Sequence, residues 1–371
     1  MSFLLLETES QQGSRFMSND GAVFSRRSFV TRAGGTIMLG ALGANMLAAC
    51  ATGESTPAGT TSGGTGGGDA LTPFTFLSFL PLTSFSVVPE MYGDLTGAFT
   101  KNHMDMTLQT VKGSAQATQL LLANKGQVAR NGLIDAMIAA FAQDQPIVIP
   151  AIDTFQVGIR IVTTDASPEP SDWVGKTIGV PSVNGTSDKT LSMSLRKMDI
   201  DPESVKRQLV GLAPGTFDLV RNGTLAGYMV SADTAQIVAK QNSDARIFVP
   251  TSVTGMNIYM TTKEQIDQHG DELKNFFLAV QQVKEGLIAE KNFDAAIKTL
   301  RSEYTFASLD DDEIANASFK ERTAAWQGKD GRTGWPDMEE LEGAYGELVD
   351  SKVVPSGKKI ESLVDTSLLP Q

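Results

Sequence analysis

Cysteine and histidine are scarce in this chain, whose 371 residues include one cysteine, Cys50, and two histidines, His103 and His269. A single cysteine excludes an internal disulfide and a thiol-rich metal site. His103 follows a helix-like run and His269 lies in a polar turn, so neither has the spacing of a metal-ligand pair or of a catalytic triad. The sequence therefore predicts no metal, no cofactor and no catalytic residue.

Basic residues are in the minority, with 31 Lys and Arg against 43 Asp and Glu and a formal net charge of −12. Nucleic-acid-binding proteins need a basic face for the phosphates, so we expect no nucleic acid partner. The hydrophobic content of 41% and the charged content of 20% are typical of a globular protein. The length is sufficient for two domains.

The N-terminal residues have the features of an export signal. Arg26 and Arg27 lie within the segment 25–30, ahead of an apolar run rich in Gly and Ala at 34–49. This order of parts matches the twin-arginine type of signal. The run is shorter than the ~20 apolar residues that a membrane-spanning helix needs. It ends in Leu-Ala-Ala-Cys at 47–50, which resembles the lipobox of bacterial lipoproteins, where the cysteine is lipidated.

We therefore interpret residues 1–49 as a twin-arginine lipoprotein signal peptide. Residues 50–72, most of them Gly, Thr, Ser, Ala and Pro, are expected to form a flexible tether. The expected location is the bacterial periplasm or cell envelope, with a lipid on Cys50 as the membrane anchor.

Beyond the tether, short apolar runs alternate with amphipathic segments, which predicts βαβ units and parallel sheets. The expected strands are 74–79, 104–111, 127–130, 147–152, 177–181, 207–212, 225–230 and 246–249. The expected helices are 87–101, 115–124, 133–143, 186–198, 216–222 and 233–240, followed by a helical C-terminal tail at 264–290, 293–303, 310–327 and 338–350.

A proline-containing break at 165–172 divides this pattern into two lobes. Two further strands, 155–163 and 255–262, carry the chain into the second lobe and back. The prediction is an α/β fold in which lobe 1 comprises 73–157 plus 256–371 and lobe 2 comprises 158–255. Ligands of open α/β sheets bind at the carboxyl ends of the strands, so two such lobes place their loops on either side of one cleft.

The segment 173–180, Trp-Val-Gly-Lys-Thr-Ile-Gly-Val, is the most specific motif of the chain, and 215–228 runs into Val-Ser-Ala-Asp at 230–233. Together with the lipobox and the tether, these motifs resemble the periplasmic solute-binding proteins of ABC importers. The similar branch serves nitrate, alkanesulfonates, taurine and thiamine pyrimidine precursors. The resemblance covers about residues 73–350. It departs at 126–131, Gly-Gln-Val-Ala-Arg-Asn, where that branch usually has Gly-x-x-Asp.

This resemblance implies a type II periplasmic-binding-protein-like fold and a membrane permease as partner. It also implies a monomer that closes on a small organic solute, either a heterocycle or a monoanion. Two alternatives stay open. One is an envelope sensor that presents its ligand to a membrane receptor, and the other is a metabolic enzyme on the same fold, although relatives of that kind rely on His, Lys and Cys clusters.

Residues that follow the predicted strands are the candidate ligand contacts, because helix starts leave N–H donors free and hydroxyl or aromatic groups suit a small organic molecule. An arginine at a strand end would clamp an oxyanion, although a surface arginine is the alternative. For the other polar residues the alternative is a helix N-cap. The candidates are Phe79, Leu82, Thr83, Ser84, Gly113, Ser114, Gln116, Arg130 and Asn131 in lobe 1, and Asn184, Gly185, Thr186, Ser187, Ser231 and Asp233 in lobe 2.

Overall fold

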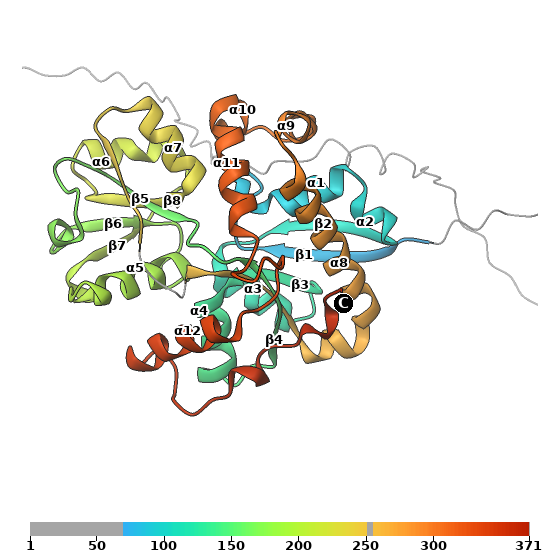
Figure 1. Cartoon of the computed structure of the whole chain (residues 1–371). Coiled ribbons are helices and arrows are strands. Elements are labelled where there is room, and N and C mark those ends of the chain that lie inside the picture. Colours follow the sequence, from blue (N-terminus) through green and yellow to red (C-terminus); the bar gives the residue numbers. More distant parts are fainter. Residues whose placement is uncertain (1–69, 251–254, 371) are drawn as a thin grey trace, which may run out of the picture. The chain divides into compact units, whose positions relative to one another are not determined.

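The computed structural model describes residues 70–250 and 255–370, which form two lobes, each built on a five-stranded sheet (Figure 1). The predicted export-signal residues Arg26 and Arg27 and the predicted lipidation site Cys50 lie outside the described residues. The two-lobed α/β fold predicted from the sequence is confirmed.

The first lobe contains the sheet with strand order β2-β1-β3-β10-β4. Its strands are β1 (Thr72–Ser78), β2 (Met104–Thr110), β3 (Val128–Gly132), β4 (Ile147–Thr154) and β10 (Asn257–Thr262). Every residue of β3, β4 and β10 is buried, as expected for strands covered on both faces. The C-terminal segment closes the edge at β4, because the backbone N–H of Ile149 donates to the carbonyl of Leu363 at 2.7 Å.

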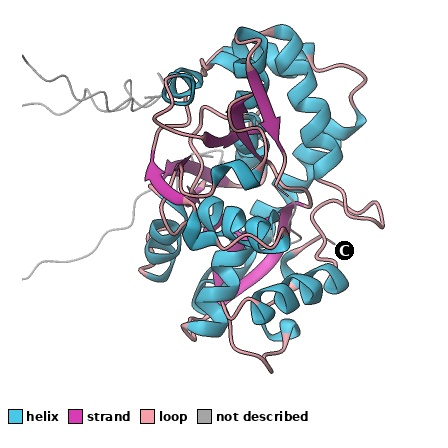
Figure 2. Ribbon diagram, turned by 90° about the vertical axis from the view of Figure 1, so that its left-hand side faces the viewer, coloured by secondary structure: helices cyan, strands magenta, loops and turns pink. Residues whose placement is uncertain are grey.

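Figure 2 shows helices around the strands of the molecule, and nine α-helices of the described residues belong to the first lobe. They are α1 (Val88–Leu95), α2 (Ala98–Lys101), α3 (Gly113–Leu122), α4 (Leu133–Met137), α8 (Lys263–Ala289), α9 (Asp294–Arg301), α10 (Ala307–Asp310), α11 (Asp312–Ala325) and α12 (Met338–Asp350). The single helix predicted at 87–101 is two helices, because the chain turns at Gly97, whose φ of +70° lies in the left-handed region. Helix α8 packs the Phe276 ring against Phe74 and Phe76, at centroid distances of 5.1 and 5.7 Å.

The second lobe contains the sheet with strand order β7-β6-β8-β5-β9. Its strands are β5 (Ile159–Thr164), β6 (Thr177–Val180), β7 (Lys206–Leu209), β8 (Gly227–Ser231) and β9 (Ala245–Phe248), and its α-helices are α5 (Thr186–Lys197), α6 (Asp218–Arg221) and α7 (Ala232–Gln241). Strand β7 ends at Leu209, three residues before the predicted end, which leaves the residues that follow it in a loop.

The prediction that both sheets are parallel is wrong, since each is mixed. Strand β10 runs antiparallel to β3 and β4, and β5 runs antiparallel to β8 and β9. The chain passes from one lobe to the other just before each of these two strands. Each strand is therefore connected to the preceding strand of the other lobe and not to a parallel neighbour through a βαβ crossover. Asn257 pairs with Thr154, and a Cβ on Gly255 would lie 3.1 Å from the Cβ of Val157. The two crossings therefore lie side by side.

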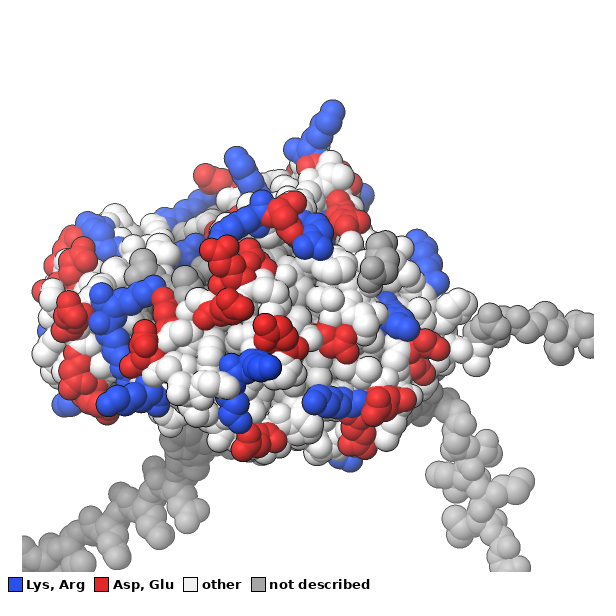
Figure 3. Space-filling model, turned by 60° about the horizontal axis from the view of Figure 1, so that its bottom comes forward, with Lys and Arg blue, Asp and Glu red and all other residues white. Residues whose placement is uncertain are grey.

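No helix in the described parts of the chain is long and apolar enough to cross a membrane. The charges on the face shown in Figure 3 are mixed, with acidic and basic side chains interspersed.

Five buried polar side chains fix the elements of the first lobe to one another. Arg130 of β3 forms an ion pair with Asp153 of β4, and both side chains are fully buried. Lys284 of α8 lies 2.9 Å from Asp153 Oδ1, and the Tyr259 hydroxyl of β10 lies 2.6 Å from Glu90 Oε1 of α1. We call Glu90, Arg130, Asp153, Tyr259 and Lys284 the ion cluster. Its charges are paired with one another, which offsets part of the cost of burying them.

Burial raises the pKa of the Glu90 carboxyl from 4.5 to about 7, despite the opposing influence of the Arg130 guanidinium. The folded chain thus holds this proton more tightly than the unfolded chain. The stability from this group is complete below the unfolded pKa of 4.5 and is lost as the pH rises through about 7.

We expect Glu90→Gln to reduce this pH dependence. Between pH 5 and 7.5, the free energy of unfolding of wild type should fall by about 2 kcal/mol more than that of the variant. This figure follows from the raised pKa of the Glu90 carboxyl, at about 1.36 kcal/mol per pKa unit. Urea unfolding at the two pH values measures the difference. Glu342→Gln, at an exposed position of α12, is the matched control and should follow wild type. Equal losses in wild type and Glu90→Gln would contradict a protonated Glu90.

Candidate functional site

A cavity of about 880 Å³ lies between the two lobes. Residues that follow the carboxyl ends of β1, β2, β6, β7 and β8 line it, together with the start of α10. The lining residues are Phe79, Leu80, Pro81, Thr83, Ser84, Thr110, Val111, Lys112, Gly113, Ser114, Pro181, Ser182, Val183, Thr186, Ser187, 209–214, Ser231, Thr234, Ile237 and 306–308. The cleft expected at the strand ends is therefore present as a cavity.

The first-lobe wall consists of the loop after β1 and the start of α3. Ser84 is the N-cap of a short 3-10 helix, and its Oγ accepts from the backbone N–H of Ser86 at 3.2 Å. Gly113 begins α3 with a φ of +81°, a conformation that favours glycine. A Cβ at this position would lie 2.8 Å from the Oγ of Ser182 in the second lobe. The absence of a side chain at 113 thus permits the two walls to approach.

The second-lobe wall consists of three strand-end segments. The loop after β6 leads into α5, where Thr186 and Ser187 line the cavity. The loop after β7 contributes the apolar residues Val210 and Leu212. After β8, the hydroxyls of Ser231 and Thr234 lie 3.0 Å apart at the start of α7.

The cavity is lined by few kinds of side chain. Its polar side chains are hydroxyls and one amine, that of Lys112, and the remaining lining side chains are apolar. No lining residue is Asp, Glu, His or Cys. Within 70–250 and 255–370, no group of three or more His, Cys, Asp or Glu residues is arranged to hold a metal ion.

Thr186 joins the lobes on one side of the cavity. Its hydroxyl lies 2.5 Å from the Ser114 hydroxyl and contacts the carboxylate of Asp135 on α4. Lys189, one turn further along α5, forms an ion pair with the same carboxylate. A Cβ on Gly132 would lie 2.8 Å from the Cβ of Thr186, so this side chain fits only against a glycine. We call Ser114, Gly132, Asp135, Thr186 and Lys189 the polar latch.

Helix α11 and the residues before it join the lobes on another side. Lys240 of α7 lies 2.7 Å from Asp311 and 2.9 Å from Glu313. Arg160 of β5 lies 2.6 Å from Glu321. These charges are partly exposed, so each pair contributes little by itself. The structure is therefore a closed arrangement of the lobes.

Eight of the fifteen candidate residues line the cavity, and seven do not. Those that line it are Phe79, Thr83, Ser84, Gly113, Ser114, Thr186, Ser187 and Ser231. Those that do not are Leu82, Gln116, Arg130, Asn131, Asn184, Gly185 and Asp233. Contact with a ligand stays a prediction for the eight.

The seven other candidates have structural partners that account for them. Arg130 is fully buried in the ion cluster, so it does not face the cavity as a clamp for an oxyanion. Asn131 donates to the carbonyl of Ser114 at 3.1 Å, and Asp233 accepts from the Ser308 hydroxyl at 2.6 Å.

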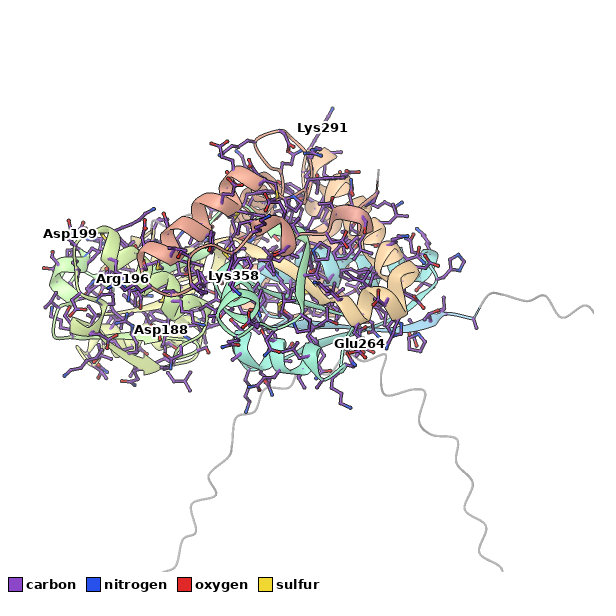
Figure 4. All side chains as sticks on the ribbon, turned by 90° about the horizontal axis from the view of Figure 1, so that it is seen from below. Asp188, Arg196, Asp199, Glu264, Lys291 and Lys358 are labelled. Atoms are coloured by element: carbon purple, nitrogen blue, oxygen red, sulfur yellow. The ribbon has the colours of Figure 1, made fainter. Side chains whose placement is uncertain are left out.

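The remaining four serve local structure. Leu82 packs against the first-lobe core. Gln116 accepts from the backbone N–H of Lys112 at 2.6 Å and thus satisfies a donor at the start of α3. The backbone N–H of Asn184 donates to Asp188 Oδ2 at 2.8 Å, and Gly185 packs against Ser182. Asp188 lies on α5 (Figure 4), where Arg207 of β7 also pairs with it at 2.7 Å.

Two parts of the lining were missed from the sequence. The loop at 210–214 follows β7 and obeys the strand-end rule, so a correct end for that strand would have found it. Residues 306–308 come from the C-terminal tail, far along the chain from either set of strand ends. No sequence signal marks them.

The family model described as NMT1/THI5 like matches residues 85–291, more than half of the chain, and the chain belongs to this family. No curated protein sequence matches it.

Solved structures share the fold. A Candida albicans protein described as having the generic periplasmic binding protein fold is 17% identical, with 81% of this chain and 98% of that chain covered at a TM-score of 0.62. The Synechocystis PCC 6803 periplasmic nitrate-binding protein NrtA is 13% identical, covering 81% and 88% at 0.60. The Escherichia coli periplasmic aliphatic sulphonate binding protein SsuA is 10% identical, covering 80% and 98% at 0.58. The fold is that of the periplasmic binding proteins.

We expect Gly132→Ala to disfavour closure. Gly132 has a φ of −82°, which alanine adopts without strain, and the three atoms nearest to the new methyl group all belong to Thr186 of the other lobe. Either the lobes separate or the overpacked closed form costs about 1–3 kcal/mol. Small-angle scattering should give a larger radius of gyration for the variant.

Gly343→Ala is the control for this substitution, because nothing lies within 4 Å of a Cβ at that position of α12. Its scattering curve should match that of wild type. If Gly132→Ala also matched wild type in scattering and in stability, the contact between Gly132 and Thr186 would not form in solution.

Proposed function

We propose that this protein is the extracytoplasmic substrate-binding protein of an ABC transporter, which captures a small organic solute between its lobes and delivers it to a membrane permease. The observation that carries the proposal is the cavity of about 880 Å³ between two sheets, lined from the carboxyl ends of strands in both. This volume lies in the range of small-molecule sites.

Similar proteins support this function. SsuA is a periplasmic aliphatic sulphonate binding protein, and NrtA is a periplasmic nitrate-binding protein. Both share the fold of this chain. The lining offers hydroxyl groups, the Lys112 amine and apolar side chains, a mixture that suits contact with a small molecule.

The mechanism that we propose is capture by closure. A ligand that touches both walls binds the closed form better than the open form and shifts the equilibrium between them. A shift from 1:99 to 99:1 requires about 10⁴-fold preference, or about 5.5 kcal/mol. The polar latch and the pairs on α11 set the starting ratio of closed to open forms, and the ligand's preference for the closed form supplies the shift from that ratio.

The hinge in this proposal lies at the paired crossings, and the moving bodies are 73–157 plus 256–371 and 158–255. The chain acts as a monomer at the periplasmic face of the membrane, held there by a lipid on Cys50 after twin-arginine export. Mass spectrometry of the membrane fraction tests this location, since lipidation would give a mature chain that begins at Cys50.

Ligand binding is tested by thermal shift with the full chain against nucleobases, thiamine pyrimidine precursors, sulfonates, carboxylates, nitrate and amino acids. A ligand at one hundred times its Kd should stabilise the fold by about 2.7 kcal/mol. Gly132→Ala should show a smaller shift with the same compound, because the variant closes less readily. If no compound stabilises the wild-type chain, the binding proposal fails.

A further inference from the structure

The ion pairs between the lobes share one arrangement of sign. Among the described residues, five ion pairs cross from one lobe to the other, and in each the basic residue belongs to the second lobe. The basic members are Arg160, Lys189, Lys197 and Lys240, and the acidic members in the first lobe are Asp135, Asp311, Glu313, Glu321 and Glu347. The paired side chains of the two lobes thus carry opposite charge.

These pairs come from separate parts of the fold. Lys189 and Lys197 lie on α5, where their partners belong to α4 and α12. Arg160 of β5 and Lys240 of α7 have partners on α11 and the residue before it, and α7 and α11 lie side by side (Figure 1). Because several elements of each lobe contribute, the separation of signs belongs to the whole contact and not to one pair of helices.

The charges along the sequence are divided unequally between the lobes. Residues 73–157 and 256–371 contain 17 Lys and Arg against 28 Asp and Glu, a formal net charge of −11. Residues 158–255 contain ten basic and ten acidic residues and are formally neutral. Four of these ten basic residues pair with the first lobe, whereas Arg207, Arg221 and Arg246 pair within their own lobe. The second lobe therefore presents positive charge to a lobe that has a surplus of negative charge.

Salt weakens these pairs because their side chains are partly exposed. The four basic side chains are 17–45% exposed. An exposed pair contributes little alone, but attractions of one direction add over the whole contact. The screening length falls from about 30 Å at 0.01 M salt to about 3 Å at 1 M. At low salt the opposite charges attract across a gap between the lobes, whereas at high salt they attract only in contact.

Two buried groups have the opposite order of sign. Asp233 of α7 in the second lobe is 2% exposed, and Arg322 of α11 in the first lobe is 4% exposed. Burial lowers the pKa of the Arg322 guanidinium, and the Asp233 carboxylate opposes this effect. Buried charges are screened much less than exposed ones, so this interaction changes little with salt. The response to salt therefore comes from the exposed pairs.

We infer that closure of this protein depends on ionic strength, because the four basic side chains of the second lobe draw it onto the acidic first lobe. Low salt favours the closed form, and high salt shifts the equilibrium toward the open form. A ligand that touches both walls is then held less tightly at high salt, even where the ligand itself has no charge. This last step rests on the proposed function, whereas the shift of the lobes does not.

Small-angle scattering of the full chain without ligand tests the shift directly. The radius of gyration is measured in about 10 mM and about 500 mM sodium chloride, between which the screening length falls severalfold. We expect a larger radius at the higher concentration, because the lobes separate when their attraction is screened. Residues 1–69 are identical in every variant, so their contribution cancels when variants are compared at one salt concentration.

The double variant Lys197→Gln/Lys240→Gln removes two of the crossing cations, neither of which lines the cavity. Its radius of gyration at low salt should lie close to the wild-type value at high salt, and should change less between the two concentrations. The matched control is Arg221→Gln/Arg246→Gln, which removes the same charge from the same lobe but from pairs that lie within it. This control should respond to salt as wild type does.

An exchange of charges distinguishes attraction between the lobes from the loss of one side chain. Lys197→Glu places like charges at the contact with Glu347, so it should shift the lobes toward the open form. Lys197→Glu combined with Glu347→Lys restores an opposite pair with the signs exchanged. The combination should recover the smaller radius of gyration at low salt, together with its increase at high salt.

The outcomes separate this inference from the proposed function. An equal radius of gyration for wild type at both salt concentrations would overturn the inference. So would a control that loses the salt response as fully as Lys197→Gln/Lys240→Gln, because net charge alone would then explain it. A radius that rises with salt in a protein for which no ligand is found would support the inference and count against the proposed function. A ligand that binds to lobes insensitive to salt would do the reverse.

Discussion

The contact of Thr186 with Gly132, Ser114 and Asp135 is the constraint on which the closed structure depends. It brings the first turn of α5 against the end of β3 and the starts of α3 and α4, so the cavity walls come from both sheets. Hydroxyl and carboxylate groups make this contact directional, whereas an apolar interface would allow the lobes to slide. A glycine and a threonine thus set the width of the space between the lobes.

Rigidity inside the first lobe has a different origin. The ion cluster links β3, β4, β10, α1 and α8 through charges and one phenol that water does not reach. Because β4 and β10 both lead to crossings between the lobes, the cluster fixes the first-lobe ends of both crossings. Under the proposed capture by closure, this cluster would keep the packing of the first lobe the same while the angle between the lobes changes.

Much of the fold follows from sequence pattern, whereas the partners of single polar residues do not. The alternation of strands and helices and the two crossings predicted the two lobes, because burial imposes a period on each element. Arg130 shows the limit. An arginine at a strand end can bind a ligand or pair with a carboxylate. Its partner Asp153 lies on β4, and the strand between β3 and β4 in the sheet is β10, which comes more than a hundred residues later in the chain than either. Thr186 was correctly expected at a helix start, but its contacts with the other lobe carry no local signal.

Residues 306–308 give the cavity a third source of walls beside the two sets of strand ends. They belong to a tail that follows the last strand, so mutations there can reshape the site without disturbing the hydrogen bonds of either sheet. The residues after them also carry acidic partners of Lys240. Changes in one short stretch of the chain can therefore alter the lining of the cavity and the ion pairs between the lobes together, while both sheets stay the same.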